Sequence, residues 1–192
     1  MPYDMNETDV RDINNFYNLM DKVCTELFIG EIWHERAGNE FRKTGLRGWG
    51  RWADAEAHGD MKTRLCIEKL LRDYCDYAVT IDATDAQRAM AYTMNGATAL
   101  KSTLELWHKR EIEFIDILNK AIMSSAINNI SIYKELVRLA DEVQGEATRV
   151  KMCMKRLELA GYNPHDIGIV SMILHKHYED NPHDQTGNVN LG

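Results

Sequence analysis

Apolar residues recur at steps of three and four over four long stretches of this chain, a spacing typical of long amphipathic helices. The stretches cover about residues 10–42, 48–78, 97–125 and 131–160, and a shorter one follows at 168–178. Gly45 interrupts the pattern after the first stretch, and Gly161, followed by Pro164, ends the fourth. β-Branched runs are rare and only 3 prolines occur, so we expect an all-α fold.

The connections between the expected helices are short except for one polar segment at about residues 80–96. A connection of this length lets the second and third helices run in the same direction. We therefore predict a four-helix bundle over residues 1–180, with a long second-to-third connection and a short C-terminal fifth helix. Residues 181–192 are expected to form a loose tail.

Composition excludes several classes of partner. The net charge is −7 and no Lys/Arg cluster stands alone, so we do not expect the protein to bind nucleic acid. No apolar run approaches the roughly 20 residues that a membrane span needs, and the polar, acidic start does not resemble a signal peptide. The 4 cysteines are scattered without a C-x-x-C pair, which predicts reduced thiols in a cytoplasmic protein.

Carboxylates and histidines interrupt the apolar stripes of all four expected helices. They are Glu31 and His34 in the first, Glu56 and Asp60 in the second, His108 and Glu111 in the third, and Glu146 in the fourth. Glu105 lies to one side of the third stripe, and Glu142 lies beside Glu146. Burying an isolated carboxylate costs several kcal/mol or shifts its pKa until the group is neutral. A pair of divalent metal ions would neutralise such a cluster, so we expect a metal centre.

Glu-x-Trp-His occurs twice, as GEIWHER at residues 30–36 and LELWHKR at 104–110. Residues three apart share a helix face, so each copy offers an oxygen and a nitrogen to one ion. Di-iron carboxylate bundles take Glu-x-x-His from two helices and a single Glu from each of the other two. The predicted ligands of two iron ions, or of manganese, are Glu31, His34, Glu105 and His108 with Glu56 and Glu146, and Asp60 and Glu142 are in reserve.

Two alternatives stay open at this point. HGDMKTR (58–64) resembles QGEATR (144–149), which would pair Asp60 with Glu146. The same acids could instead form buried salt bridges, for example with Arg64 and Arg149, and hold no metal.

Two segments resemble ferritin subunits. KTGLRGWGRWADAEAH is similar to the ferritin loop and second-helix entry, and LELAGYNPHDIGIVSMILHKHYED is similar to the end of the fourth helix and the short fifth helix. The resemblance covers about residues 10–180 and implies a ferritin-like four-helix bundle. The first-helix ligand of ferritins would fall on Glu26 and is present, but most of the other usual ligands are absent, because their positions would fall on Asp60 and Thr63, on Trp107 and near Val143. The centre is therefore degenerate or rebuilt elsewhere.

The resemblance implies a function in iron chemistry. We expect a homo-oligomeric di-iron protein that oxidises Fe(II) with O2 or peroxide, with iron storage if the subunits form a shell. One alternative is a di-iron oxygenase or hydroxylase acting on an organic substrate. Another is a structural bundle that has lost its metal.

Overall fold

The computed structural model describes residues 7–82, 84, 96–125, 129–182 and 189, and every long regular element in this part of the chain is a helix. The helices are α1 (Glu7–Lys43), α2 (Arg47–Cys75), α4 (Gly96–Ser125), α5 (Ile130–Leu159) and α6 (Pro164–Asp180). The prediction of an all-α fold is confirmed. No helix among the described residues has both the length and the apolar character that crossing a membrane requires. The predicted tail at 181–192 lies largely outside the described residues.

Local signals in the sequence explain where these helices begin and end. Gly45 after α1 and Gly161 after α5 have φ angles of 83° and 64°, the left-handed conformation that glycine adopts without strain. The side chain of Asn129 caps α5 by accepting hydrogen bonds from the backbone N–H groups of Ser131 and Ile132. Pro164 opens α6, where its missing N–H costs nothing.

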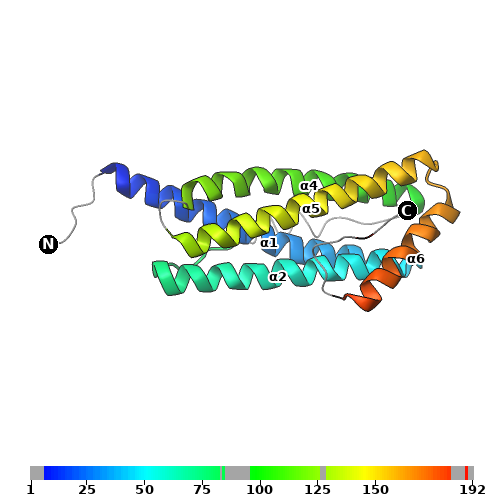
Figure 1. Cartoon of the computed structure of the whole chain (residues 1–192), viewed down its shortest axis with the longest axis horizontal. Coiled ribbons are helices and arrows are strands. Elements are labelled where there is room, and N and C mark those ends of the chain that lie inside the picture. The colour runs from blue at the N-terminus through cyan, green and yellow to red at the C-terminus, as the bar shows by residue number, and fades with distance from the viewer. Residues whose placement is uncertain (1–6, 83, 85–95, 126–128, 183–188, 190–192) are drawn as a thin grey trace.

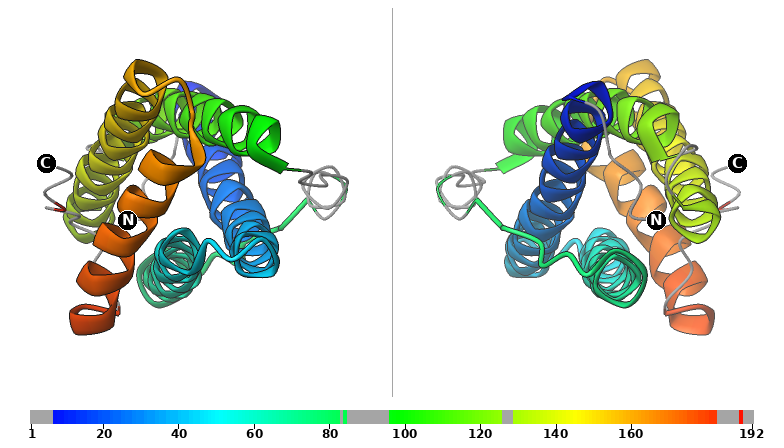
Figure 2. Two further views of the ribbon diagram at one scale, coloured as in Figure 1. Left: turned by 90° about the vertical axis from the view of Figure 1, so that its right-hand side faces the viewer. Right: turned by 90° about the vertical axis from the view of Figure 1, so that its left-hand side faces the viewer.

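The four long helices pack around one another. α1 lies along α2 and α4, and α5 lies along α4 and α2, so each long helix contacts two others. Figure 1 shows α2 and α4 running in the same direction, as the long connection between them predicts, and α1 and α5 running the opposite way. The shorter α6 lies across one end of the assembly against α2 and α5, as the end-on views in Figure 2 show.

The first part of the long connection, residues 76–82, is an extended segment that lies along α1. The backbone N–H of Thr80 donates to Asp21 Oδ1 at 2.9 Å, and that of Asp82 donates to Thr25 Oγ1 at 3.2 Å. Tyr77, Val79 and Ile81 alternate with exposed residues and pack against the apolar core. The connection therefore leaves α2 by running along the outside of α1.

The core consists of two apolar clusters. The cluster nearer α6 contains all four tryptophans, Trp33, Trp49, Trp52 and Trp107, and the other cluster contains residues such as Phe16, Leu27, Leu118 and Leu136. Between them lie buried polar side chains from α1, α2, α4 and α5, including His34, Glu56, Glu111, Glu146 and Arg149. We call this group, together with Asp60, the polar layer; it contains the candidate site.

Candidate metal centre

His34 lies at the middle of the polar layer with only 1% of its surface exposed. Its Nδ1 is 2.9 Å from Asp60 Oδ2 on α2, and its Nε2 is 3.4 Å from Glu146 Oε1 on α5. The contact of Nε2 with Glu146 is longer than that of Nδ1 with Asp60 and lacks the geometry of a regular hydrogen bond. The ring centres of Trp33 and Trp107 lie 5.1 Å and 4.9 Å from that of the imidazole and 5.3 Å from each other, so the three rings pack together as one cluster.

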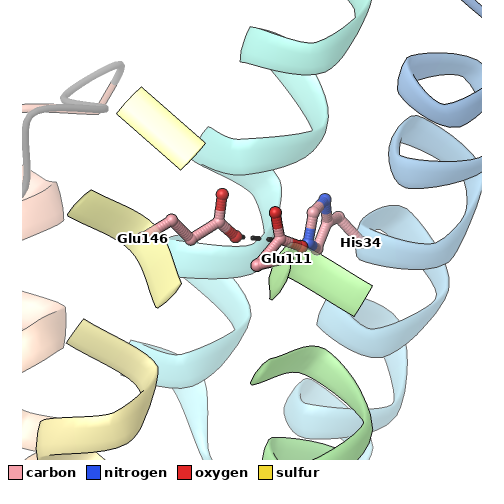
Figure 3. Close-up of side chains that lie close together, drawn as sticks. All are labelled: His34, Glu111 and Glu146. Atoms are coloured by element: carbon pink, nitrogen blue, oxygen red, sulfur yellow. Dashed lines mark ion pairs between the residues drawn. The ribbon is translucent and has the colours of Figure 1, made fainter. Parts of the chain in front are cut away.

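Two buried carboxylates face this histidine. Glu146 accepts a hydrogen bond of 2.5 Å from Trp107 Nε1, which fixes its Oε1 beside the imidazole. Glu111 on α4 has 4% of its surface exposed. Figure 3 shows His34, Glu111 and Glu146 converging from three helices, and one donor atom of each lies within 4.8 Å of the others.

Glu56 and Arg149 form a buried ion pair within the same layer. Arg149 Nη2 donates to Glu56 Oε1 at 3.0 Å, and Trp52 Nε1 donates to the same oxygen at 2.7 Å. Arg149 comes three residues after Glu146, so both project from one face of α5. The guanidinium also acts electrostatically on Glu146.

The missing side chain of Gly30 makes room for Asp60. A Cβ atom at this position of α1 would lie 2.4 Å from Asp60 Oδ2 and 3.5 Å from Arg110 Nη2. Arg110 attracts the Asp60 carboxylate and stacks over Trp33, with its guanidinium carbon 5.6 Å from the ring centre. Gly30 therefore lets Asp60 reach the imidazole.

The two partners of His34 stabilise its charged form. Burial alone would lower the pKa of His34, but hydrogen bonding to Asp60 and Glu146 outweighs this and raises it to about 10. Burial would likewise raise the pKa of Glu146, yet the hydrogen bond and positive charge of His34, helped by Arg149, lower it. In the metal-free state His34 is therefore an imidazolium paired with carboxylates.

The other acids of the layer hold protons more tightly than usual. Burial, together with repulsion from Glu146, raises the pKa of Glu56 to about 8 despite the opposing charge of Arg149. The same two causes, in the same order, raise the pKa of Glu111 well above its ordinary value. Without a metal ion, the positive charges of His34, Arg110 and Arg149 are therefore too few to keep all the carboxylates of the layer ionised.

No protein-family model matches the chain, and no curated protein sequence matches it. The assignment of this centre therefore rests on the arrangement of its residues.

The structure brings four of the eight predicted ligands into the polar layer: His34, Glu56, Asp60 and Glu146. The other four lie outside the polar layer. Glu31 is bonded to Arg64, Glu142 to Arg138, the exposed Glu105 lies 3.8 Å from Lys101, and His108 is half-buried. The expectation that the two Glu-x-Trp-His copies form matching half-sites is therefore wrong about where their side chains lie.

Helix geometry explains the misplacement on α4. The buried residues of this helix include Leu100, Leu104, Trp107, Glu111 and Leu118, at steps of three, four and seven. Glu105 and His108 each come one residue after a buried position, and one residue turns an α-helix by about 100°. The Trp of the repeat, rather than its Glu and His, therefore faces the core in LELWHKR.

Glu111 completes the three-donor cluster and is absent from the predicted ligands. The sequence does indicate that Glu111 is buried, because it lies on the apolar stripe of α4 one turn after Trp107 and between Leu104 and Leu118. The repeated Glu-x-Trp-His pattern instead predicts Glu105 and His108 as the ligands on this helix.

The three donors suit a transition-metal ion. Imidazole nitrogen with two carboxylates is a donor set for Fe(II), Mn(II) or Zn(II). Ligands about 2.1 Å from a tetrahedral ion lie about 3.4 Å apart, and His34 Nε2 is 3.4 Å from Glu146 Oε1. Asp60 at Nδ1 matches the carboxylate that commonly orients a metal-bound histidine. The residues present therefore fit a bound metal ion.

Proposed function

We propose that this protein is a ferritin-like metal-binding bundle that holds a divalent transition-metal ion, iron foremost, between α1, α4 and α5. The observation that carries the proposal is the cluster of His34 with two buried carboxylates, Glu111 and Glu146, in which one donor atom of each lies within 4.8 Å of the others. Two carboxylates buried beside one imidazole carry more negative charge than the ring can neutralise, and a divalent ion would supply the difference.

The arrangement of the helices supports the ferritin-like part of the proposal. α2 and α4 run in the same direction through a long connection, and a short α6 follows α5. Each long helix contributes one acid or histidine to the surroundings of the imidazole: His34, Asp60, Glu111 and Glu146. Inward-facing acids and histidines from all four helices are the usual plan of metal sites in such bundles.

Metal content tests the proposal directly. Protein equilibrated anaerobically with Fe(II), and separately with Mn(II) or Zn(II), should retain metal after dialysis when measured by mass spectrometry. Substitution of one donor, as His34→Gln, Glu111→Gln or Glu146→Gln, should weaken binding by more than the roughly 10–100-fold typical of losing an outer partner.

The residues that the structure leaves outside the centre provide matched controls. His108→Gln, Glu105→Gln and Glu142→Gln make the same chemical changes, the last two on the same helices as Glu111 and Glu146. They should bind metal as the wild type does. Loss of binding in these variants, with binding retained in the first set, would restore the sequence-based ligand set and reject the centre described here.

A metal-free charge network is the second candidate, and one observation favours it. Protonated His34 can pair with both Asp60 and Glu146, and Arg149 pairs with Glu56. If this alternative is correct, the protein retains no metal after equilibration and dialysis. His34→Gln then destabilises the fold, because it breaks buried ion pairs. Metal retention with increased thermal stability on loading decides against it.

Oxidation of Fe(II) by O2 or peroxide, and iron storage, extend the same proposal. Aerobic addition of Fe(II) should give a faster rise in ferric absorbance than protein-free buffer, and the Glu111→Gln variant should lose the difference. A homo-oligomeric shell should elute at a mass of many chains in size-exclusion chromatography. The oxygenase alternative would need a substrate cavity at the centre, whereas the cavity of about 580 Å³ lined by Leu46, Ile169 and Met172 lies between the α1–α2 turn and α6.

A further inference from the structure

Arg149 provides a permanent positive charge inside the polar layer. Only 8% of its surface is exposed, and it belongs to the helix that also supplies Glu146. Its guanidinium donates to Glu56, and its charge favours the ionised forms of both Glu56 and Glu146. These two carboxylates repel one another, so they are the pair that a second metal ion would be expected to neutralise.

The charges of the layer balance for one ion. The four carboxylates of the layer, Glu56, Asp60, Glu111 and Glu146, face two arginines. Arg149 acts on Glu56 and Glu146, and Arg110 acts on Asp60 and Glu111. Arg110 also lies 4.0 Å from Glu26, a partly exposed residue outside the layer that is not part of this balance. One divalent ion with a neutral imidazole brings this group to zero net charge. A second divalent ion would leave two uncompensated positive charges in a buried site, where isolated charges are costly.

We propose that Arg149 limits the centre to one metal ion by holding Glu56 and supplying the positive charge that a second ion would otherwise provide. The inference rests on the proposed metal binding and deepens it, since it makes Arg149 the residue that sets the number of ions. It departs from the two ions expected from the sequence, because Glu56 is held by Arg149 and Trp52 rather than facing His34 as a free ligand.

Counting bound ions in Arg149 variants tests this proposal. Wild-type protein saturated anaerobically with Mn(II) should retain one ion per chain by mass spectrometry. Arg149→Gln removes the positive charge and releases Glu56, so it should retain two. Arg149→Lys preserves the charge and should retain one, and the double variant Arg149→Gln with Glu56→Gln removes both partners and should also retain one.

Each outcome separates this inference from the proposed function. Wild type without metal would reject the proposed function itself. Wild type with one ion and a folded Arg149→Gln variant that still retains one would reject the role of Arg149 alone. Wild type with two ions would also reject it, because the arginine would then fail to exclude the second ion.

A measurement on the wild type keeps the proposal testable if Arg149→Gln does not fold. Electron paramagnetic resonance of Mn(II) distinguishes an isolated ion from two exchange-coupled ions by the number and spacing of hyperfine lines. Saturated wild-type protein should give the six-line pattern of isolated Mn(II). The closely spaced multiline pattern of a coupled pair would overturn the inference without any variant.

Discussion

At the scale of single residues, neighbouring side chains hold the His34 ring in one orientation. Asp60 holds Nδ1, Trp33 and Trp107 pack on the imidazole, and Nε2 remains beside Glu146. A ligand already oriented loses less rotational freedom when it binds a metal, so part of the affinity arises from residues that do not touch the ion.

The contribution of Asp60 can be measured by Asp60→Asn. The amide keeps the size of the side chain but accepts a weaker hydrogen bond from His34 Nδ1 than the carboxylate does. We expect metal affinity to fall by about 10–100-fold while the protein stays folded, as followed by competition with a metal-binding dye. The control is Asp54→Asn, which lies on α2 like Asp60 but is exposed and pairs with Arg42 of α1. This variant should leave the metal affinity unchanged.

The cysteines should differ sharply in reactivity. Burial raises the pKa of Cys24 and Cys153 to about 12, whereas Cys66 is exposed. The thiolate is the reactive form, and at pH 8 only about one in 10,000 molecules of a thiol with a pKa of 12 carries it. A disulfide reagent should label Cys66 rapidly and Cys24 and Cys153 only after denaturation. Equal labelling rates at all the cysteines in the native protein would contradict this description of the core.

At the scale of helices, the contact between α2 and α6 depends on the absence of a side chain at Gly48. The Gly48 N–H donates to Ser171 Oγ at 3.2 Å, and a Cβ atom at Gly48 would lie 1.7 Å from the backbone oxygen of Ser171. A backbone atom cannot move aside as the end of a flexible side chain can, so α6 must shift as a whole.

Gly48→Ala should therefore destabilise the protein, at or above the upper end of the roughly 1–3 kcal/mol typical of overpacking. Gly168→Ala provides a matched control on α6, because a Cβ atom there would meet nothing within 4 Å. This control should be neutral or stabilising by up to about 1 kcal/mol, owing to the better helix propensity of alanine. Chemical denaturation followed by circular dichroism measures both. A destabilised Gly168→Ala with an unaffected Gly48→Ala would refute the packing.

Helices and turns were more predictable from the sequence than the side chains that meet inside. Gly45, Gly161 and Pro164 mark boundaries by local backbone preference, so the bounds of the long helices were close to those observed. The facing side chains depend on helix rotation, where an error of one residue exchanges a buried position for an exposed one. Glu105 and Glu111 differ in this way, and the Arg149–Glu56 pair joins residues 93 apart in the sequence, which no local pattern reveals.

At the scale of the whole molecule, the stability of the metal-free protein should fall as pH rises. The pKa of His34 is raised to about 10 from an ordinary 6.5, so its protonation favours the fold fully below 6.5 and ceases to do so above 10. The pKa of Glu56 is raised from an ordinary 4.5 to about 8, so deprotonation of this residue also lowers stability as the pH rises through that range. The melting temperature of chelator-treated protein should therefore decrease between pH 6.5 and 10.

Metal-loaded protein provides the comparison. Because a bound ion requires neutral His34 and ionised carboxylates, rising pH favours metal binding and should offset the loss over the same range. Differential scanning calorimetry at saturating Mn(II) and with chelator should give curves that diverge with pH. A melting temperature of the chelator-treated protein that rises from pH 6.5 to 10 would contradict the charge assignment of the polar layer.

The polar layer also determines what an optical probe of unfolding can detect. All four tryptophans lie in the apolar cluster nearer α6, on one side of the layer. Intrinsic fluorescence therefore reports the loosening of one half of the protein, whereas far-ultraviolet circular dichroism reports helices that run through both. If removing the metal lets the half that contains Phe16 and Leu118 unfold first, ellipticity will decline before tryptophan emission shifts. The separation between these two unfolding curves will then measure how strongly the centre couples the two halves.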